Sequence, residues 1–319
     1  MLFRSTDLAN MLVRGGMRTV QTIGVPPAGF KPDADAVVIS LKSRTIEVQD
    51  AISQSVQACR WLQEAGARQF FFKYCSTFDS TPKGNIGPVA EALMQALQCR
   101  FAIACPAFPE NGRSVYHGHL FVGDRLLSES GMEKHPLTPM TDANLVRVLQ
   151  RQSTKEVTLA RHQVVRAGAD ALQSHLQSLQ DEGYALAIVD AISDQDLHTI
   201  GQACRDHMLI TGGSGVALGL PGNFECQGLL HHKAQAATMP SLPGHSLVVS
   251  GSCSKATNEQ VAHWLQSRVG FQIDPLALHR GEPMVQKAVE FARSRLVQEP
   301  VLIYATNSPE AVGAVQAAI

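Results

Sequence analysis

The chain has 319 residues, of which 45% are hydrophobic and 17% charged, with a formal net charge of −1. This composition is typical of a soluble globular protein long enough for two domains. Nucleic-acid-binding proteins usually need a basic stripe to neutralise phosphates, and none is visible in this near-neutral sequence. No apolar run approaches the roughly 18 residues that would span a bilayer, so no membrane partner is expected either.

The seven cysteines are scattered, odd in number and lack a CxxC pair. This pattern predicts reduced thiols, and the N-terminus is too polar for a secretion signal. We therefore expect a cytoplasmic protein.

Short apolar runs rich in β-branched or aromatic residues alternate along the chain with stretches of helical period. The predicted strands are residues 19–23, 36–41, 69–74, 101–105, 185–190, 208–211, 247–250 and 301–304, and the predicted helices include 48–65, 89–97, 167–179 and 261–265. Continuous apolar strands that alternate with helices predict an α/β fold with a parallel sheet covered on both faces. A Gly123-Asp124 pair between two apolar runs predicts an antiparallel hairpin near residues 115–127.

Residues 220–245 are rich in proline and glycine and have weak periodicity, so we expect a linker there. This gives a first domain over residues 1–235 and a second over residues 246–319. The second stretch is shorter than the roughly 100 residues of a usual domain. We therefore expect the second α/β domain to be incomplete.

The most polar loop follows the predicted strand at residues 69–74. Residues 73–88 offer several hydroxyls, one acid, two lysines and glycines that let backbone N–H groups approach a ligand. Ligands of open parallel sheets bind beyond the carboxyl ends of strands, and this inventory suits a polyhydroxylated anion. The alternative is a polar turn whose Asp and Ser cap a helix, with Pro88 in its first turn.

Two further strand-end loops are candidates for anion binding. In the loop at residues 106–113, Arg113 follows a glycine turn and either clamps a carboxylate bidentately or forms a surface salt bridge. The glycines of residues 211–215 either direct backbone amides at an anion, helped by a helix dipole, or make a tight strand-to-helix turn.

A fourth loop, residues 250–257, presents hydroxyls and amides as a phosphate site would. Thr257 and Gln260 have capping-box spacing, so Thr257 is alternatively a helix cap. The sequence contains neither of the usual nucleotide motifs, GxxxxGK[ST] and GxGxxG, and the absence of the second, the dinucleotide fingerprint, disfavours a dehydrogenase on a similar sheet. Its paired histidines lack zinc partners at ligand spacing, and no metal ligand is assigned.

The segment KYCSTFDST at residues 73–81, continued by GNIGP at 84–88, closely resembles the 3-oxo-tetronate kinase branch of the four-carbon acid sugar kinases. The resemblance continues through residues 111–113, 120–140, 211–215 and 251–257 and covers essentially the whole chain. It implies an N-terminal sugar-acid domain and a C-terminal nucleotide domain. It also implies transfer of the γ-phosphate of ATP to the terminal hydroxyl of 3-oxo-tetronate, with Mg²⁺ accompanying the nucleotide.

By position, the resemblance assigns three groups of residues. The substrate side is Lys73, Ser76, Asp79, Ser80, Thr81, Lys83, Gly84, Asn85 and Arg113. The anion loop is Gly212, Gly213, Ser214 and Gly215. The ATP side is Gly251, Ser252, Ser254 and Thr257, with Ser254 as the foremost contact.

The chain departs from the family pattern at both ends. The family opens with a strand that runs into Asp-Asp-Phe-Thr-Gly, whereas only Asp7 onward matches here, so the paired acids fall at or before Met1. A second glycine-rich nucleotide segment and the closing Gly-Val-Pro segment do not occur. The expectation is a chain shortened at both ends, and the competing hypothesis is a non-catalytic remnant that at most binds a sugar acid.

Overall fold

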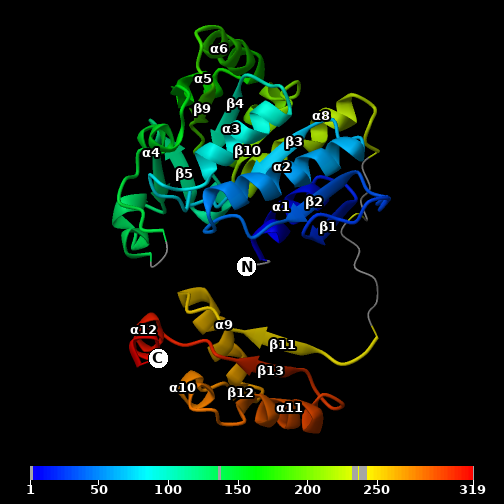
Figure 1. Ribbon diagram of the computed structural model, residues 1–319, viewed down its shortest axis with the longest axis vertical. Coiled ribbons are helices and arrows are strands. Elements are labelled where there is room, and N and C mark those ends of the chain that lie inside the picture. Colours follow the sequence, from blue (N-terminus) through cyan, green and yellow to red (C-terminus); the bar gives the residue numbers. More distant parts are fainter. Residues whose placement is uncertain (1–2, 136–137, 232–235, 237–242, 319) are drawn as a thin grey trace. The chain divides into compact units, whose positions relative to one another are not determined.

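The computed structural model describes residues 3–135, 138–231, 236 and 243–318. The chain divides into two compact units, Met1–Thr238 and Met239–Ile319. Each unit has its own parallel sheet (Figure 1). Each also has its own buried side chains.

The first unit is built on five parallel strands in the order β3-β10-β4-β9-β8. These strands are β3 (Phe70–Lys73), β4 (Ala102–Cys105), β8 (Val157–Ala160), β9 (Leu186–Val189) and β10 (Leu209–Gly212). The three central strands are buried along their whole length, as expected of parallel strands covered on both faces. A separate parallel pair, β1 (Thr19–Ile23) and β2 (Ala36–Ser40), completes the predicted strands of this unit. The α/β prediction is confirmed.

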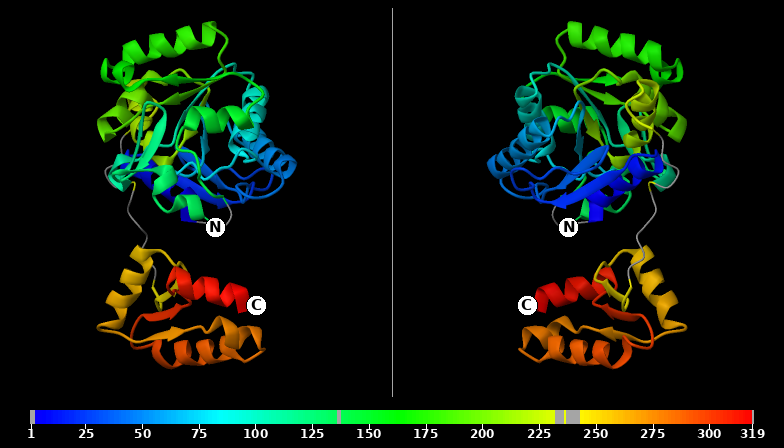
Figure 2. Two further views of the ribbon diagram at one scale, coloured as in Figure 1. Left: turned by 90° about the vertical axis from the view of Figure 1, so that its left-hand side faces the viewer. Right: turned by 90° about the vertical axis from the view of Figure 1, so that its right-hand side faces the viewer.

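Helices lie on both sides of the five-stranded sheet (Figure 2). The helices α2 (Val48–Glu64), α3 (Ile86–Ala96) and α4 (Leu145–Gln152) contact one another in succession. A second succession joins α5 (His162–Arg166), α6 (Ala169–Asp181), α7 (Asp194–Ala203), the 3-10 helix η4 (Ser214–Gly219) and α1 (Phe3–Arg14). Leucines on the inner face of α6 show why it packs there, because Leu172 and Leu176 are fully buried.

The predicted hairpin is confirmed and is part of a three-stranded antiparallel sheet. It contains β5 (Arg113–Tyr116), β6 (His119–Val122) and β7 (Arg125–Leu126), preceded by η1 (Pro109–Asn111) and followed by η2 (Leu127–Glu129) and η3 (Met132–Lys134). The fully buried carboxylate of Asp190, at the end of β9, accepts the backbone N–H groups of His117, Gly118 and His162 at 2.9–3.0 Å. This carboxylate therefore holds the β5–β6 turn against the carboxyl edge of the sheet.

The second unit has three parallel strands in the order β11-β13-β12. They are β11 (Leu247–Ser250), β12 (Gly270–Gln272) and β13 (Val301–Tyr304), with helices α9 (Lys255–Leu265), α10 (Pro275–His279), α11 (Met284–Arg295) and α12 (Pro309–Ala318). Val301 and Leu302 of the middle strand are buried, whereas Val249 of the edge strand β11 is 71% exposed.

Part of the predicted linker is folded instead. Pro221, which we interpreted as a linker signal, is the first residue of helix α8 (Pro221–Cys226), where its missing N–H costs nothing. Asn223 donates a hydrogen bond to the carbonyl of Gly201 at 2.8 Å, and Leu230 is only 4% exposed. Residues 221–230 therefore belong to the first unit. Most of residues 232–242 lie outside the described residues, so the boundary placed there remains a prediction.

None of the helices that the structure describes combines the length and apolarity needed to span a bilayer.

Candidate functional site

A small cavity of about 90 Å³ lies where the loops after β2 and β3 meet the start of α3. Its lining is polar and cationic at the strand ends and apolar toward the helix. The lining residues are Ser5, Leu41, Lys42, Ser43, Arg44, Phe72, Lys73, Tyr74, Cys75, Asp79, Ser80, Asn85, Ile86 and Val89.

Phe78 lies in a sharp turn of the β3 loop, next to the cavity residue Asp79. It has a left-handed backbone (φ 49°), which is rare for a bulky residue, and it is fully buried. Its ring packs edge-on against Tyr74 with centroids 5.3 Å apart, and its N–H donates to the carbonyl of Cys75 at 2.9 Å. Strained conformations of this kind persist where the surroundings enforce them, and they concentrate at functional sites. The turn places Asp79 at the cavity.

An ion pair crosses the cavity between its two loops. Arg44 Nη1 lies 2.7 Å from Asp79 Oδ2, and the Asp79 side chain has no exposed surface while that of Arg44 is 18% exposed. The hydroxyl of Thr77 donates a further hydrogen bond to Asp79 Oδ1. Lys73 Nζ lies 3.7 Å from Asp7 Oδ2, and the Lys73 side chain is 11% exposed. The carboxylate of Asp79 is thus held away from water, while cationic groups reach the cavity.

Asn85 and Ser80 anchor the loop to its neighbours. The side-chain amide of Asn85 donates to the carbonyls of Ser43 and Ile46, both at 2.9 Å, which ties the β2 loop to the start of α3. Ser80 Oγ accepts a hydrogen bond from Gln152 Nε2 at 2.6 Å. Both side chains are therefore engaged within the protein as well as bordering the cavity.

The structure separates the nine residues proposed for the substrate side. Of these, the cavity brings together Lys73, Asp79, Ser80 and Asn85. Ser76, Thr81, Lys83 and Gly84 belong to the same loop but are outside the lining, and Lys83 is exposed.

Arg113 lies apart from this loop, at the start of β5. Its guanidinium donates to the carbonyl of Asn111, and its buried Nε has no hydrogen-bond partner among the described residues. No salt bridge of Arg113 is found among the described residues, while its alternative role, a clamp on a substrate carboxylate, remains a prediction.

Sequence reasoning missed Arg44, Lys42 and Ser43. They follow the predicted strand at 36–41, and the rule that ligands bind beyond strand ends identifies their loop as readily as the loop after β3. Asp79 stands out in the sequence as the single acid of the β3 loop, whereas its partner Arg44 lies 35 residues earlier in the chain.

The glycines of residues 212–215 have a packing role. A Cβ atom on Gly213 would lie 2.6 Å from the carbonyl oxygen of Pro106, and one on Gly215 would lie 2.5 Å from that of Ala107. The N–H of Gly213 donates to Cys105 at 3.0 Å, and Ser214 is 2% exposed. These observations favour the tight strand-to-helix turn, while anion binding by this loop remains a prediction.

The loop after β11 leads into α9, and its helix cap differs from the predicted one. Ser254 is the N-cap, and its Oγ accepts the N–H of Thr257 at 3.2 Å. Thr257 is therefore the third helical residue, since the helix begins three residues earlier than a Thr257 cap requires. Gly251, Ser252 and Ser254 are exposed at this helix N-terminus.

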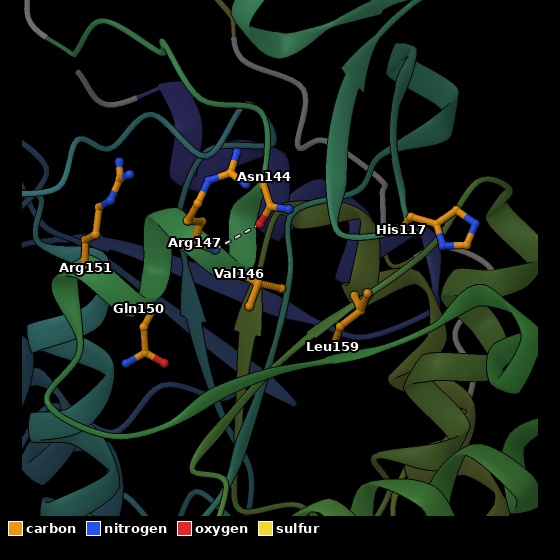
Figure 3. A pocket seen from close by; sticks show the side chains of 7 residues that line it. All are labelled: His117, Asn144, Val146, Arg147, Gln150, Arg151 and Leu159. Carbon is orange, nitrogen blue, oxygen red and sulfur yellow. Dashed lines mark hydrogen bonds between the residues drawn. The ribbon is translucent and has the colours of Figure 1, made fainter.

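A larger cavity of about 520 Å³ lies elsewhere in the first unit, beside α4 and β8 (Figure 3). It is lined by His117, Asn144, Val146, Arg147, Gln150, Arg151 and Leu159. The guanidinium of Arg147 donates two hydrogen bonds of 2.6 and 2.8 Å to Asp142, and these hold the pKa of Asp142 below its ordinary value. Gln150 is bound at both ends of its amide to backbone of residues 155–157. Figure 3 shows His117 at the opposite end of the lining from the arginines, so the polar groups do not converge.

Among the residues that the structure describes, no three His, Cys, Asp or Glu side chains gather to hold a metal ion.

The chain was compared with protein-family models and with known proteins. Residues 5–220 match a family model described as a sugar-binding N-terminal domain, and residues 247–319 match one described as a nucleotide-binding C-terminal domain. The 3-oxo-tetronate kinase of Burkholderia multivorans is 59% identical over 315 residues, which cover 99% of this chain and 73% of the relative. The chain belongs to the 3-oxo-tetronate kinase family.

Other members of the 3-oxo-tetronate kinase family give the same result. The enzyme of Cupriavidus necator is 60% identical over 98% of this chain and 73% of its own length. The enzyme of Escherichia coli is 45% identical over 98% of this chain and 80% of its own length. The chain is therefore a kinase of the four-carbon acid sugar type, as its sequence motifs imply.

Solved structures agree on the fold of this family. A protein of Salmonella typhimurium LT2, 43% identical, superposes with a TM-score of 0.87 over 99% of this chain and 75% of its own. A Haemophilus influenzae protein, 40% identical, gives a TM-score of 0.78 over 99% of this chain and 76% of its own.

Proposed function

We propose that this kinase transfers the γ-phosphate of ATP to the terminal hydroxyl of 3-oxo-tetronate, and that the acid binds in the cavity between the β2 and β3 loops. The observation that carries the location is the buried Arg44–Asp79 pair at 2.7 Å. A buried carboxylate that orients an arginine toward a cavity prepares the guanidinium for a second, incoming carboxylate. The names of the relatives supply the substrate.

The charges of the cavity suit a small anionic acid. Lys42, Arg44 and Lys73 contribute three cations at its border, against the carboxylates of Asp79 and Asp7. One of the five guanidinium N–H groups of Arg44 is used by Asp79, and a fork of two parallel N–H donors matches a carboxylate. We assign Arg44 to the substrate carboxylate and Lys73 to the same anion.

On the nucleotide side, we propose the loop at residues 251–257. Its glycine and serines are exposed at the N-terminus of α9, where backbone N–H groups and the helix dipole favour phosphate. The hydroxyl of Ser254 already caps the helix, so its contribution is to fix the loop. Mg²⁺ binds mainly through nucleotide phosphates and water in such enzymes, so we expect it to accompany the bound ATP.

We place the reaction in the cytoplasm. All seven cysteines are free thiols, and reduced cysteines are usual in that compartment.

A coupled assay of ADP release with Mg-ATP and 3-oxo-tetronate tests this function, alongside calorimetric titration with the acid. Arg44→Met should raise KM for the acid at least about tenfold, the loss of one charge-assisted pair, and leave KM for ATP within about twofold. Arg147→Met is the matched control, because Arg147 also pairs with an aspartate but lies at the other cavity. Equal kinetics for Arg44→Met and the wild type would contradict the assignment of the cavity.

A further inference from the structure

Gln152, the last residue of α4, reaches the substrate loop from a different part of the fold. Its side-chain Nε2 donates to Ser80 Oγ and to the carbonyl of Thr81, both at 2.6 Å. Its Oε1 accepts the N–H of Gly87 at 2.9 Å. One buried amide, 9% exposed, therefore holds both ends of the segment from Ser80 to Gly87.

The glycines of this segment fit around Gln152. A Cβ atom on Gly87 would lie 2.7 Å from Gln152 Cβ and 2.8 Å from its carbonyl oxygen. A Cβ atom on Gly84 would lie 3.0 Å from Gln152 Nε2. Neither glycine has a positive φ, so close contacts are what require glycine at both positions. At Gly87 the contact is with Gln152, whereas at Gly84 the atom nearest to the added Cβ is Ser80 Oγ, which Gln152 Nε2 holds by a hydrogen bond.

The segment held by Gln152 borders the proposed substrate cavity. Ser80 and Asn85 both line that cavity, and Asn85 also fixes the loop that carries Arg44. Gln152 itself is not among the lining residues. It can therefore act on a bound acid only through the residues that it holds in place.

We propose that Gln152 is a positioning residue for the sugar acid, an inference that rests on the proposed function. Glutamine suits this position because it supplies a donor and an acceptor at once, at the two ends of a planar amide. Methionine preserves the volume and loses all three hydrogen bonds. Glutamate keeps the acceptor for Gly87 but loses the donor to Thr81 and Ser80. Each change leaves buried polar groups of the segment unpaired, so the segment relaxes away from the cavity.

The test compares Gln152 with its neighbour Gln150 in the whole chain. Gln150 lies on the same helix and also uses both ends of its amide, donating to the carbonyl of Lys155 and accepting the N–H of Val157, both at 2.9 Å. Gln152→Met should raise KM for the sugar acid at least about tenfold, with KM for ATP within about twofold. Gln150→Met should lower the melting temperature about as much as Gln152→Met does, but it should leave the KM values for the acid and for ATP unchanged.

Amide hydrogen exchange provides a second readout that needs no activity. In Gln152→Met, but not in Gln150→Met, the amides of residues 81–87 should exchange faster than in the wild type. Gln152→Glu serves if the methionine variant does not fold, and it should show an intermediate rise in KM.

The outcomes separate two failures. A wild-type chain that neither binds nor phosphorylates the acid overturns the proposed function, and the positioning role with it. An active wild type in which Gln152→Met and Gln150→Met have the same KM for the acid overturns the positioning role alone. Unchanged exchange at residues 81–87 in Gln152→Met also overturns it.

Discussion

The Arg44–Asp79 pair should be coupled both in folding and in substrate use. Asp79 has a fully buried side chain and Arg44 a mostly buried one, with 2.7 Å between Nη1 and Oδ2. Removing one member of a buried pair leaves the other without compensation, which costs about 3 kcal/mol. We therefore expect Asp79→Asn to lower the free energy of unfolding by about 3 kcal/mol. Arg44→Met should cost about 2 kcal/mol, because the hydroxyl of Thr77 still compensates the aspartate.

We also consider the double variant that carries both Arg44→Met and Asp79→Asn. Its loss of unfolding free energy should be smaller than the sum of the two single losses by about 2 kcal/mol, the interaction energy of a close pair. The same pattern should appear in kcat/KM. Asp79→Asn alone should lower kcat/KM at least about tenfold, about 1.4 kcal/mol of transition-state stabilisation, because it releases Arg44. In the Arg44→Met background, the same substitution should change kcat/KM less than about twofold.

These comparisons of the two single variants with the double variant are double-mutant cycles. Urea unfolding measures the cycle in stability, and the coupled ATP assay measures the cycle in kcat/KM. The pair of Asp142 and Arg147 is the control, because its arginine side chain is 56% exposed. Its double-mutant cycle should give no more than about 1 kcal/mol in unfolding and no effect on kcat/KM. Strictly additive effects of Arg44→Met and Asp79→Asn on unfolding and on kcat/KM would refute the reasoning. The two residues would then act independently of one another.

Three further predictions concern stability. Asp190→Ala should lower the free energy of unfolding by about 3 kcal/mol in thermal melts, since one buried and two partly buried backbone N–H groups lose their acceptor. Burial alone would raise the pKa of Glu91, but hydrogen bonds from Ser153 and Thr154 outweigh it and hold the pKa below its ordinary 4.5. The stabilisation by Glu91 is therefore complete above pH 4.5 and is lost as the pH falls through the lower folded value, so wild type and Glu91→Gln should converge in stability in acid. Ser254→Ala should destabilise the second unit by about 1 kcal/mol through loss of its helix cap, with faster amide exchange at the start of α9.

The strands and the principal loop could be predicted from sequence because their signals are local. Each predicted strand is a contiguous apolar run, and the structure places all eight within two residues of the expected bounds. The β3 loop was identified because it follows such a run. The strand β8 was missed because Val157-Thr158-Leu159-Ala160 is a short run at the edge of the sheet, with weaker apolar character.

The contacts that shape the site could not be predicted, because they join distant parts of the chain. Gln152 bonds to a segment 65 to 72 residues earlier, and nothing in its own neighbourhood distinguishes it from Gln150. The glycines of residues 212–215 illustrate the opposite difficulty. Their pattern is equally compatible with an anion loop and with close backbone packing, and only the approach of residues 105–107 in the folded structure favours packing.

Amide hydrogen exchange with and without bound sugar acid tests the location of the substrate most directly. The account predicts that 3-oxo-tetronate slows exchange at residues 41–46 and 73–88, the two loops that border the cavity, and leaves residues 211–215 and the α4 cavity unchanged. Protection confined to residues outside those two loops would contradict the account.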